Sequence, residues 1–324
     1  SASGASGYLT CDRFQYNLVG TVGASTVTQN TVTDLPGFTK SLKVDVTTAD
    51  ASLAVGDRLT LRYAMEGQDV QQVAKGTSSA EQLTLSFYIK ATKTGTQIVE
   101  LFDHDNTRHC AKSVTINSSN TWEKKTITYP ADTTGAFDND NAISLSIFFG
   151  IAVGTNFTSG TLATAWASNT LVNRFAGQVN HFDSTDNNFE ITGLQLEVGS
   201  QATPFEHRSF GEELLLCKRY CNVIAPINDE AFTFGHVRTS TLCVGTIRLH
   251  PVMRSTPTLA FSGDTEFQVQ HANGATQTTG MSAGELSTEG ATMIATVGSG
   301  LTTGQGAEIR EHTTGATVTI DAEL

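Results

Sequence analysis

An eleven-residue stretch of alternating side chains constrains the fold of this chain more than any other feature. From residue 143 to residue 153 every second position is apolar: Ile143, Leu145, Ile147, Phe149, Ile151 and Val153. Successive side chains of a β-strand point to opposite faces of the sheet, so this period of two predicts a strand with one buried face. Ser144 and Ser146 lie between the apolar positions, and we expect them to point away from the core.

Shorter stretches of the same kind recur along the chain. Apolar and polar side chains alternate at residues 42–46, 59–63 and 83–89, and polar turns rich in Gly, Thr, Asn and Asp separate such stretches. Charged residues make up only 16% of the chain, which is typical of a β protein with uncharged exposed strand faces. The pattern predicts an all-β fold of two β-sandwich, jelly-roll-like domains.

One predicted strand changes its parity within a few residues. Phe189 and Ile191 share one parity, whereas Leu194 and Leu196 share the other. A β-bulge at Gly193 would return all four side chains to one buried face. The sequence therefore predicts a bulge at this glycine.

A single helix is predicted between the two β regions. Ser209 and Glu212 form a capping box, and one apolar stripe follows at Phe210, Leu214, Cys217 and Cys221. We divide the chain into a flexible linker (1–7, read as the cut end of a longer protein), a jelly roll (8–208), a connecting helix (209–223) and a C-terminal β-sandwich (224–324).

Further apolar residues on this helix predict a second contact surface. Leu215, Leu216 and Tyr220 widen the apolar surface beyond one stripe, so the helix needs two neighbours. One neighbour is its own sandwich. The other is either an identical helix around a symmetry axis or the second domain of the same chain.

Charge and length exclude several functions. The chain carries 20 basic and 32 acidic residues, a formal net charge of −12, which argues against nucleic acid and against anionic lipid as partners. No apolar run is long enough to cross a membrane, and residues 1–7 lack the features of a signal peptide.

The odd number of cysteines, 5, predicts reduced thiols and synthesis in a reducing cytoplasm.

No catalytic motif is found in the sequence. It contains no nucleophile elbow, no metalloprotease helix motif, no phosphate-binding loop and no dinucleotide fingerprint. We therefore expect a protein that is not an enzyme. A pair of carboxylates that only the fold brings together remains the alternative.

Acidic loops offer candidate metal ligands. Asp138 and Asp140 lie in one Asp- and Asn-rich cluster, and Asp183 and Asp186 lie in another. Carboxylate and carbonyl oxygens suit Ca²⁺, so these four residues are the candidate site, and its prediction is that EDTA lowers the melting temperature. The alternative is no cofactor, with the same side chains closing Asx turns.

An exposed aromatic ring on a β-sandwich can stack against the C–H face of a sugar. Of the two tryptophans, Trp166 lies in a predicted loop with Arg174 and Phe175 nearby, and these three residues are the candidate ligand site. The alternative is that the rings belong to the core or hold the loop in place.

Several segments resemble a module of tailed-phage tail fibres and related virion proteins, especially those of marine phages. The resemblance rests on ITGLQLEVG at 191–199, ATPFEHR at 202–208, GEEL at 211–214 and CKRY at 217–220. Upstream segments at 12–14, 41–43, 66–69, 121–125 and 137–141 match the same module, and residues 250–258 and 321–324 match in outline.

This resemblance implies a jelly roll similar to carbohydrate-binding modules, followed by a C-terminal β-domain, in a homotrimeric virion protein assembled in the host bacterial cytoplasm. It implies as partners other virion proteins and a host surface glycan. The resemblance identifies no sugar-binding residue in this chain. Three functions follow, in order of preference: a non-enzymatic tail fibre or receptor-binding protein, a structural protein that decorates the capsid or tail, and a depolymerase with carboxylates in a groove between subunits.

Overall fold

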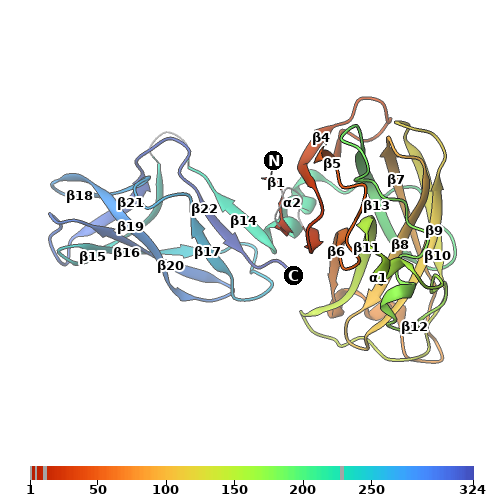
Figure 1. Cartoon of the computed structure of the whole chain (residues 1–324). Coiled ribbons are helices and arrows are strands. Elements are labelled where there is room, and N and C mark those ends of the chain that lie inside the picture. The colour runs from red at the N-terminus through yellow and green to blue at the C-terminus, as the bar shows by residue number, and fades with distance from the viewer. Residues whose placement is uncertain (1, 4–5, 10–12, 227–229) are drawn as a thin grey trace. The chain divides into compact units, whose positions relative to one another are not determined.

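The computed structural model describes residues 2–3, 6–9, 13–226 and 230–324, and it divides into two compact units. The first contains residues up to His207 together with Leu324, and the second runs from Arg208 to Glu323. Strands dominate both units, which confirms the all-β prediction (Figure 1). Among the described residues, no helix is both long and apolar enough to span a bilayer.

The first unit is a sandwich of two antiparallel sheets. One sheet has the order β1-β4-β5-β13-β7-β10 and the other the order β12-β9-β8-β11-β6-β3-β2. The strands are β1 (Ala2–Ser3), β2 (Gly7–Tyr8), β3 (Phe14–Val19), β4 (Ala24–Thr31), β5 (Lys40–Thr48), β6 (Arg58–Glu66), β7 (Leu83–Ala91), β8 (Gly95–Asp103), β9 (Arg108–Ile116), β10 (Glu123–Tyr129), β11 (Ile143–Val153), β12 (Ala167–Ser168) and β13 (Asn188–Val198). Short helical turns are η1 (Gly67–Asp69), η2 (Gln71–Val73), α1 (Thr155–Thr158) and η3 (Leu171–Asn173).

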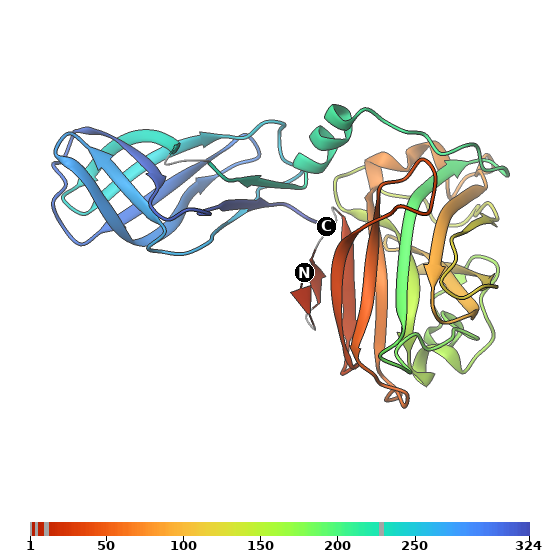
Figure 2. The ribbon, with the colours of Figure 1, turned by 90° about the horizontal axis from the view of Figure 1, so that it is seen from above.

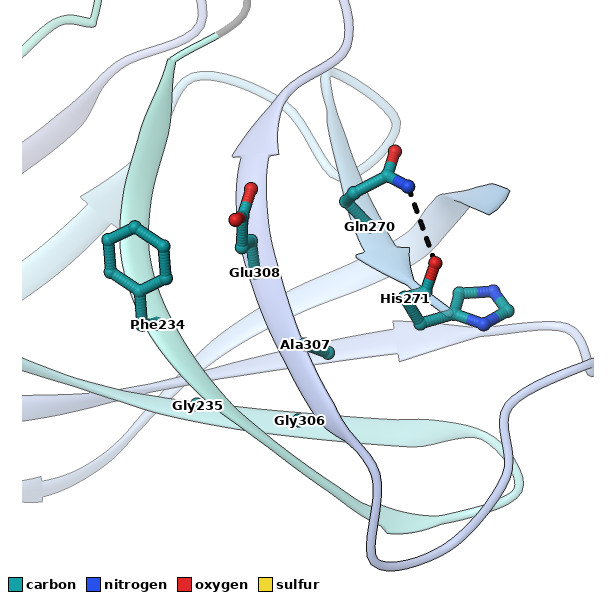
Figure 3. A pocket seen from close by; sticks show the side chains of 7 residues that line it. All are labelled: Phe234, Gly235, Gln270, His271, Gly306, Ala307 and Glu308. Carbon is teal, nitrogen blue, oxygen red and sulfur yellow. Dashed lines mark hydrogen bonds between the residues drawn. The ribbon is translucent and has the colours of Figure 1, made fainter. Parts of the chain in front are cut away.

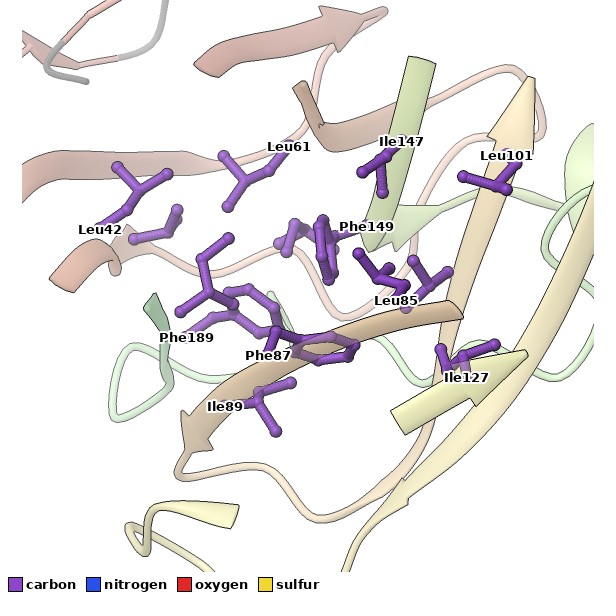
Figure 4. Packing of buried hydrophobic residues seen from close by; sticks show 14 of the residues in the cluster. Leu42, Leu61, Leu85, Phe87, Ile89, Leu101, Ile127, Ile147, Phe149 and Phe189 are labelled. Atoms are coloured by element: carbon purple, nitrogen blue, oxygen red, sulfur yellow. The ribbon is translucent and has the colours of Figure 1, made fainter. Parts of the chain in front are cut away.

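The core of the first unit lies between these two sheets. Strand β7 contributes Leu85, Phe87 and Ile89, and β11 contributes Ile147 and Phe149 (Figure 4). The rings of Phe87 and Phe149 meet edge to face, with centroids 5.1 Å apart. Every second side chain of these strands points into the space between the two sheets, and together these side chains form one continuous apolar layer.

Strand β11 is buried on both faces, and its serines point away from the core between the sheets, as predicted. Ser144 and Ser146 are fully buried, and Oγ of Ser146 contacts Nε of Arg62 and Nε2 of His104. Elsewhere, the segment 154–187 folds back over the outer face of the second sheet. A smaller apolar cluster forms there: Ile98, Ala111, Phe148, Val153, Phe157 and Phe175. The chain thus covers a sheet face that alternation alone would leave in solvent.

The predicted bulge in β13 is confirmed. The register of β13 against β7 shifts between Thr192 and Gln195, and Gly193 has a φ of +60°. An added Cβ on Gly193 would lie 2.8 Å from the ring of Phe38. Only glycine fits this backbone conformation and this space without strain.

The segment 1–7 differs from the predicted linker where it is described. Ala2–Ser3 form β1 against β4, and Gly7–Tyr8 form β2 against β3. Residues 1, 4 and 5 lie outside the described part of the chain, as does Cys11.

The second unit contains one helix, a small sheet and a barrel (Figure 2). The three-stranded sheet has the order β14-β22-β17, and six strands close into an antiparallel barrel in the order β15-β16-β20-β19-β18-β21. This closed barrel differs from the second sandwich that the sequence predicts. Its elements are α2 (Phe210–Lys218), β14 (Cys221–Ile224), β15 (Ala231–Thr239), β16 (Leu242–Arg248), β17 (Thr258–Phe261), β18 (Phe267–His271), β19 (Gly274–Leu286), β20 (Gly290–Val297), β21 (Gly306–Glu311) and β22 (Val318–Asp321).

Helix α2 begins as predicted and ends earlier. The hydroxyl of Ser209 accepts from the backbone N–H of Glu212, whose carboxylate reaches back to Ser209, which confirms the capping box. Cys221 already starts β14, so the helix is shorter than the predicted 209–223. Tyr220 is only 3% exposed, which corrects its assignment to an oligomer interface.

Candidate functional site

Trp166 holds a loop in place. Its indole N–H donates to the carbonyl of Pro130 at 2.8 Å, and the half-buried ring packs against the core. The ammonium of Lys75 lies 5.3 Å from the ring centroid, within cation–π range. These contacts join the loop that contains Trp166 to the loop after β10, so the structure favours the alternative reading for this residue.

Arg174 and Phe175 are buried, which corrects their assignment as ligand residues. Arg174 is 5% exposed, and its Nε and Nη2 donate to the carboxylate of Glu100 at 2.8 and 2.5 Å. Nδ1 of His109 lies 2.9 Å from the same carboxylate. The physical reason is the folding of segment 154–187 over the sheet, which leaves Phe175 without any exposed surface.

The aspartates predicted to bind Ca²⁺ form turns and ion pairs. Asp140 accepts from the backbone N–H of Ala142, and Asp138 is exposed. Asp183 pairs with Lys93. Asp186 is exposed, on the turn that follows. Within the described ranges, no three His, Cys, Asp or Glu side chains are grouped so that they could hold a metal ion.

The ion pair at Asp183 keeps this carboxylate charged. Burial raises the pKa of Asp183, but hydrogen bonds from Lys93 and Asn187 outweigh burial and hold the pKa below its usual value. The sequence predicted a metal ligand here because Asp and Asn serve turns and cations equally well.

Two of the cysteines predicted to be reduced are buried. Cys110 and Cys243 lie in the cores of the first and second units. Burial raises the pKa of Cys110 to about 12 and that of Cys243 to about 11. Both therefore act as small apolar side chains, not as nucleophiles.

The second unit carries an exposed aromatic ring that the sequence reading missed. Phe234 on β15 is 73% exposed. In the register of the barrel it lies opposite Glu308 on β21, and Glu308 lies opposite Gln270 on β18. These three side chains form a row across three neighbouring strands on the outside of the barrel (Figure 3).

Two shallow hollows flank Phe234. The hollow on the β21 side measures about 370 Å³ and includes Glu308, Gln270 and His271 in its lining. The hollow on the β16 side measures about 470 Å³ and offers the polar groups of His236, Arg238, Thr246, Glu285 and Thr292. An aromatic ring between two hollows with convergent hydrogen-bonding groups is an arrangement that suits a polyhydroxylated ligand.

A register irregularity explains why this ring was missed. Phe232 and Phe234 have the same parity, which predicts that they share a face. The pairing of β15 with β21 shifts between Ala231 and Thr233. Phe232 consequently points inward, with its ring centroid 5.0 Å from that of Phe267, whereas Phe234 points to solvent. No sequence signal marks this bulge.

Comparison with known proteins yields distant likenesses only. No family model and no curated protein matches the chain. The enzymatically active domain of bacteriophage CBA120 tailspike protein 4 is 14% identical with a TM-score of 0.31, over 57% of this chain and 19% of the tailspike chain. The family 11 carbohydrate-binding module of the Clostridium thermocellum cellulase Lic26A-Cel5E is 15% identical with a TM-score of 0.28, over 61% of this chain and 97% of the module.

Proposed function

We propose that this chain is a non-enzymatic, glycan-binding component of a phage virion, a tail fibre or receptor-binding protein that contacts host surface glycans. The observation that carries the glycan part is Phe234, an exposed ring between two hollows lined by polar side chains. The virion part rests on the sequence resemblance described above and on a weakly charged β surface with 16% charged residues.

The chemistry of the contact follows from the row on the barrel. The face of Phe234 packs against the apolar C–H face of a sugar ring. Glu308 and Gln270 on one side, and Arg238 and Glu285 on the other, exchange hydrogen bonds with its hydroxyl groups. A shallow and open site of this kind binds each sugar weakly, so useful affinity arises from several copies acting together.

The test uses soluble glycans, so that avidity does not enter. A glycan array identifies a ligand, and calorimetric titration compares the native chain with Phe234→Ala. We expect the affinity to fall about tenfold, since an aromatic contact of this type contributes about 1–1.5 kcal/mol. Phe210→Ala is the matched control, because Phe210 is a phenylalanine of the same unit that is 82% exposed on α2. Equal loss in both variants, or no loss in Phe234→Ala, would contradict the site.

The proposal that the chain is not an enzyme is tested with the same ligand. We expect no release of new reducing ends when the bound polysaccharide is incubated with the protein. A rise in reducing ends would replace this proposal with the depolymerase reading.

A second candidate function, structural decoration of the particle, is favoured by helix α2. Leu215 and Leu216 are 48% and 41% exposed, and Phe210 lies on the same short helix. Such an apolar surface suits contact with further copies, as in a homotrimer, or with other virion proteins. A cryo-EM map of the particle decides between the two functions: trimers projecting from the tail support host recognition, and copies at capsid symmetry positions support decoration.

A further inference from the structure

Most basic side chains that reach the interior of the first unit meet a carboxylate. Lys75 contacts Asp103, Arg108 contacts Asp132, and Arg174 contacts Glu100. Arg58 and Arg62 on β6 are different. Their hydrogen bonds go to neutral amide and hydroxyl oxygens.

These two arginines share the outer face of the second sheet. They are four residues apart on one strand, and Thr60 lies between them on the same face. Nη2 of Arg58 donates to Oδ1 of Asn17 at 3.2 Å, and Nη1 of Arg62 donates to Oε1 of Gln15 at 3.0 Å. The amide of Asn17 in turn donates to Oε1 of Gln15 at 3.0 Å. The two amides therefore hold both guanidinium groups in place without neutralising their charge.

Three groups on this face are buried without a hydrogen-bond partner among the described residues. They are Nε of Arg58, Oγ1 of Thr60 and Nη2 of Arg62. Buried polar groups in folded proteins are almost always satisfied, so three unsatisfied ones at alternate positions of one strand require an explanation. All three can donate a hydrogen bond, so the group that completes them is an acceptor.

The surroundings leave an excess of positive charge. Arg174 lies nearby, but Glu100 already binds both Arg174 and His109. His104 does not add to the positive charge at neutral pH, because burial, helped by Arg62 and Arg174, lowers its pKa to about 4. Within the described ranges, no carboxylate forms an ion pair with Arg58 or Arg62.

We propose that the outer face of β6, with Arg58 and Arg62, binds the carboxylate or sulfate group of an acidic glycan. The guanidinium fork matches the planar pair of carboxylate oxygens and the oxygens of a sulfate group. Arg58, Arg62, Gln15 and Asn17 are each partly exposed, so a charged group has access from solvent. The buried ring of Phe157 lies 5.1 Å from the guanidinium carbon of Arg58 and holds that group in place by a cation–π contact.

This site differs from the Phe234 site, and only its glycan part rests on the proposed function. A chain with a net charge of −12 repels an acidic polymer at long range. The positive charge of the two arginines opposes this repulsion locally. Screening limits long-range repulsion to about 8–10 Å at physiological salt, whereas the two arginines act at contact.

The experiment titrates the full chain with three probes at constant ionic strength: inorganic sulfate, an oligogalacturonate and a sulfated galactan oligosaccharide. We expect binding of sulfate and of at least one oligosaccharide, and at least a tenfold loss of affinity in the Arg58→Gln, Arg62→Gln double variant. Lys43→Gln is the matched control, because Lys43 is a half-buried cation on the other sheet that already pairs with Asp45 at 3.1 Å. Circular dichroism confirms folding, and Arg62→Lys, which keeps the charge and loses the fork, provides an intermediate variant.

The outcomes separate the two parts of the inference. Unchanged sulfate affinity in the double variant, or equal loss in Lys43→Gln, overturns the anion site. Sulfate binding that depends on the arginines, with neither oligosaccharide bound, supports the anion site and overturns the acidic glycan. Binding of an oligosaccharide that Phe234→Ala leaves intact and the arginine variant abolishes supports the inference independently of the barrel.

Discussion

Replacing Lys75 by methionine should destabilise the first unit strongly, because its ammonium group occupies a cage of oxygens. Nζ of Lys75 lies 2.5 Å from Oδ2 of Asp103 and 3.1 Å from Oδ2 of Asp132. It also donates to the carbonyls of Thr134 and Gly135 at 2.9 and 2.7 Å. The side chain of Lys75 is 1% exposed, and that of Asp103 is fully buried.

The magnitude follows from what remains after the substitution. Breaking a buried ion pair by removing one partner costs about 3–5 kcal/mol, because the other charge stays buried without compensation. Here Asp132 keeps Arg108 at 2.8 Å, and Asp103 keeps the amide of Asn106 at 3.0 Å. We therefore expect the free energy of unfolding to fall by about 3 kcal/mol, the lower end of this range. That corresponds to a fall of roughly 6–12 °C in the melting temperature of a unit of this size.

The assay is urea unfolding followed by tryptophan fluorescence. Both tryptophans, Trp122 and Trp166, lie in the first unit, so the signal reports on that unit alone. Lys43→Met is the control, since its partly exposed pair with Asp45 is worth at most about 1 kcal/mol. A loss below about 1 kcal/mol in Lys75→Met with an unchanged m-value would refute the reasoning.

Three further predictions concern the same fold. Burial lowers the pKa of both His104 and His181 to about 4; the unfolded chain takes up these protons near pH 6.5. The stability contributed by the neutral forms is therefore present above pH 6.5 and falls toward pH 4 by about 1.4 kcal/mol per pH unit for each histidine. A urea midpoint that does not change between pH 7 and pH 5 would contradict this. Gly193→Ala should cost about 2 kcal/mol, since its φ of +60° and the ring of Phe38 at 2.8 Å both oppose a methyl group; Gly56→Ala, whose Cβ meets only an ordinary contact at 3.9 Å, should change the urea midpoint little. Saturating EDTA should leave the melting temperature unchanged, since Asp140 accepts from the backbone N–H of Ala142 and Asp183 pairs with Lys93, and a clear drop would restore the Ca²⁺ hypothesis.

Local features of the fold were accessible from the sequence because local geometry causes them. The alternation in β11 follows from the opposite directions of neighbouring side chains in a strand. The capping box at Ser209 satisfies backbone groups within three residues. The bulge at Gly193 is visible as a parity change with a glycine at the break. Each signal is contained within about ten residues.

The candidate sites were much less accessible. The sequence placed Arg174 and Phe175 beside a ligand, but whether a loop residue is exposed depends on where its loop packs, and this loop covers a sheet. Phe234 was missed because an unmarked register shift between Ala231 and Thr233 moves it to the outer face of the barrel. Arg58 and Arg62 gave no signal, because their lack of a carboxylate partner is a property of the neighbouring strands.

The sequence by itself determined the strand-rich class, the helix start and the bulge, since short-range sterics and hydrogen bonds decide them. The tertiary structure alone decided that the second unit closes six strands into a barrel, because closure depends on the pairing of β15 with β21, which lie far apart in the chain. It also decided which side chains meet solvent. Burial is a property of all the surfaces that a residue contacts, and those surfaces come together only when the whole chain has folded.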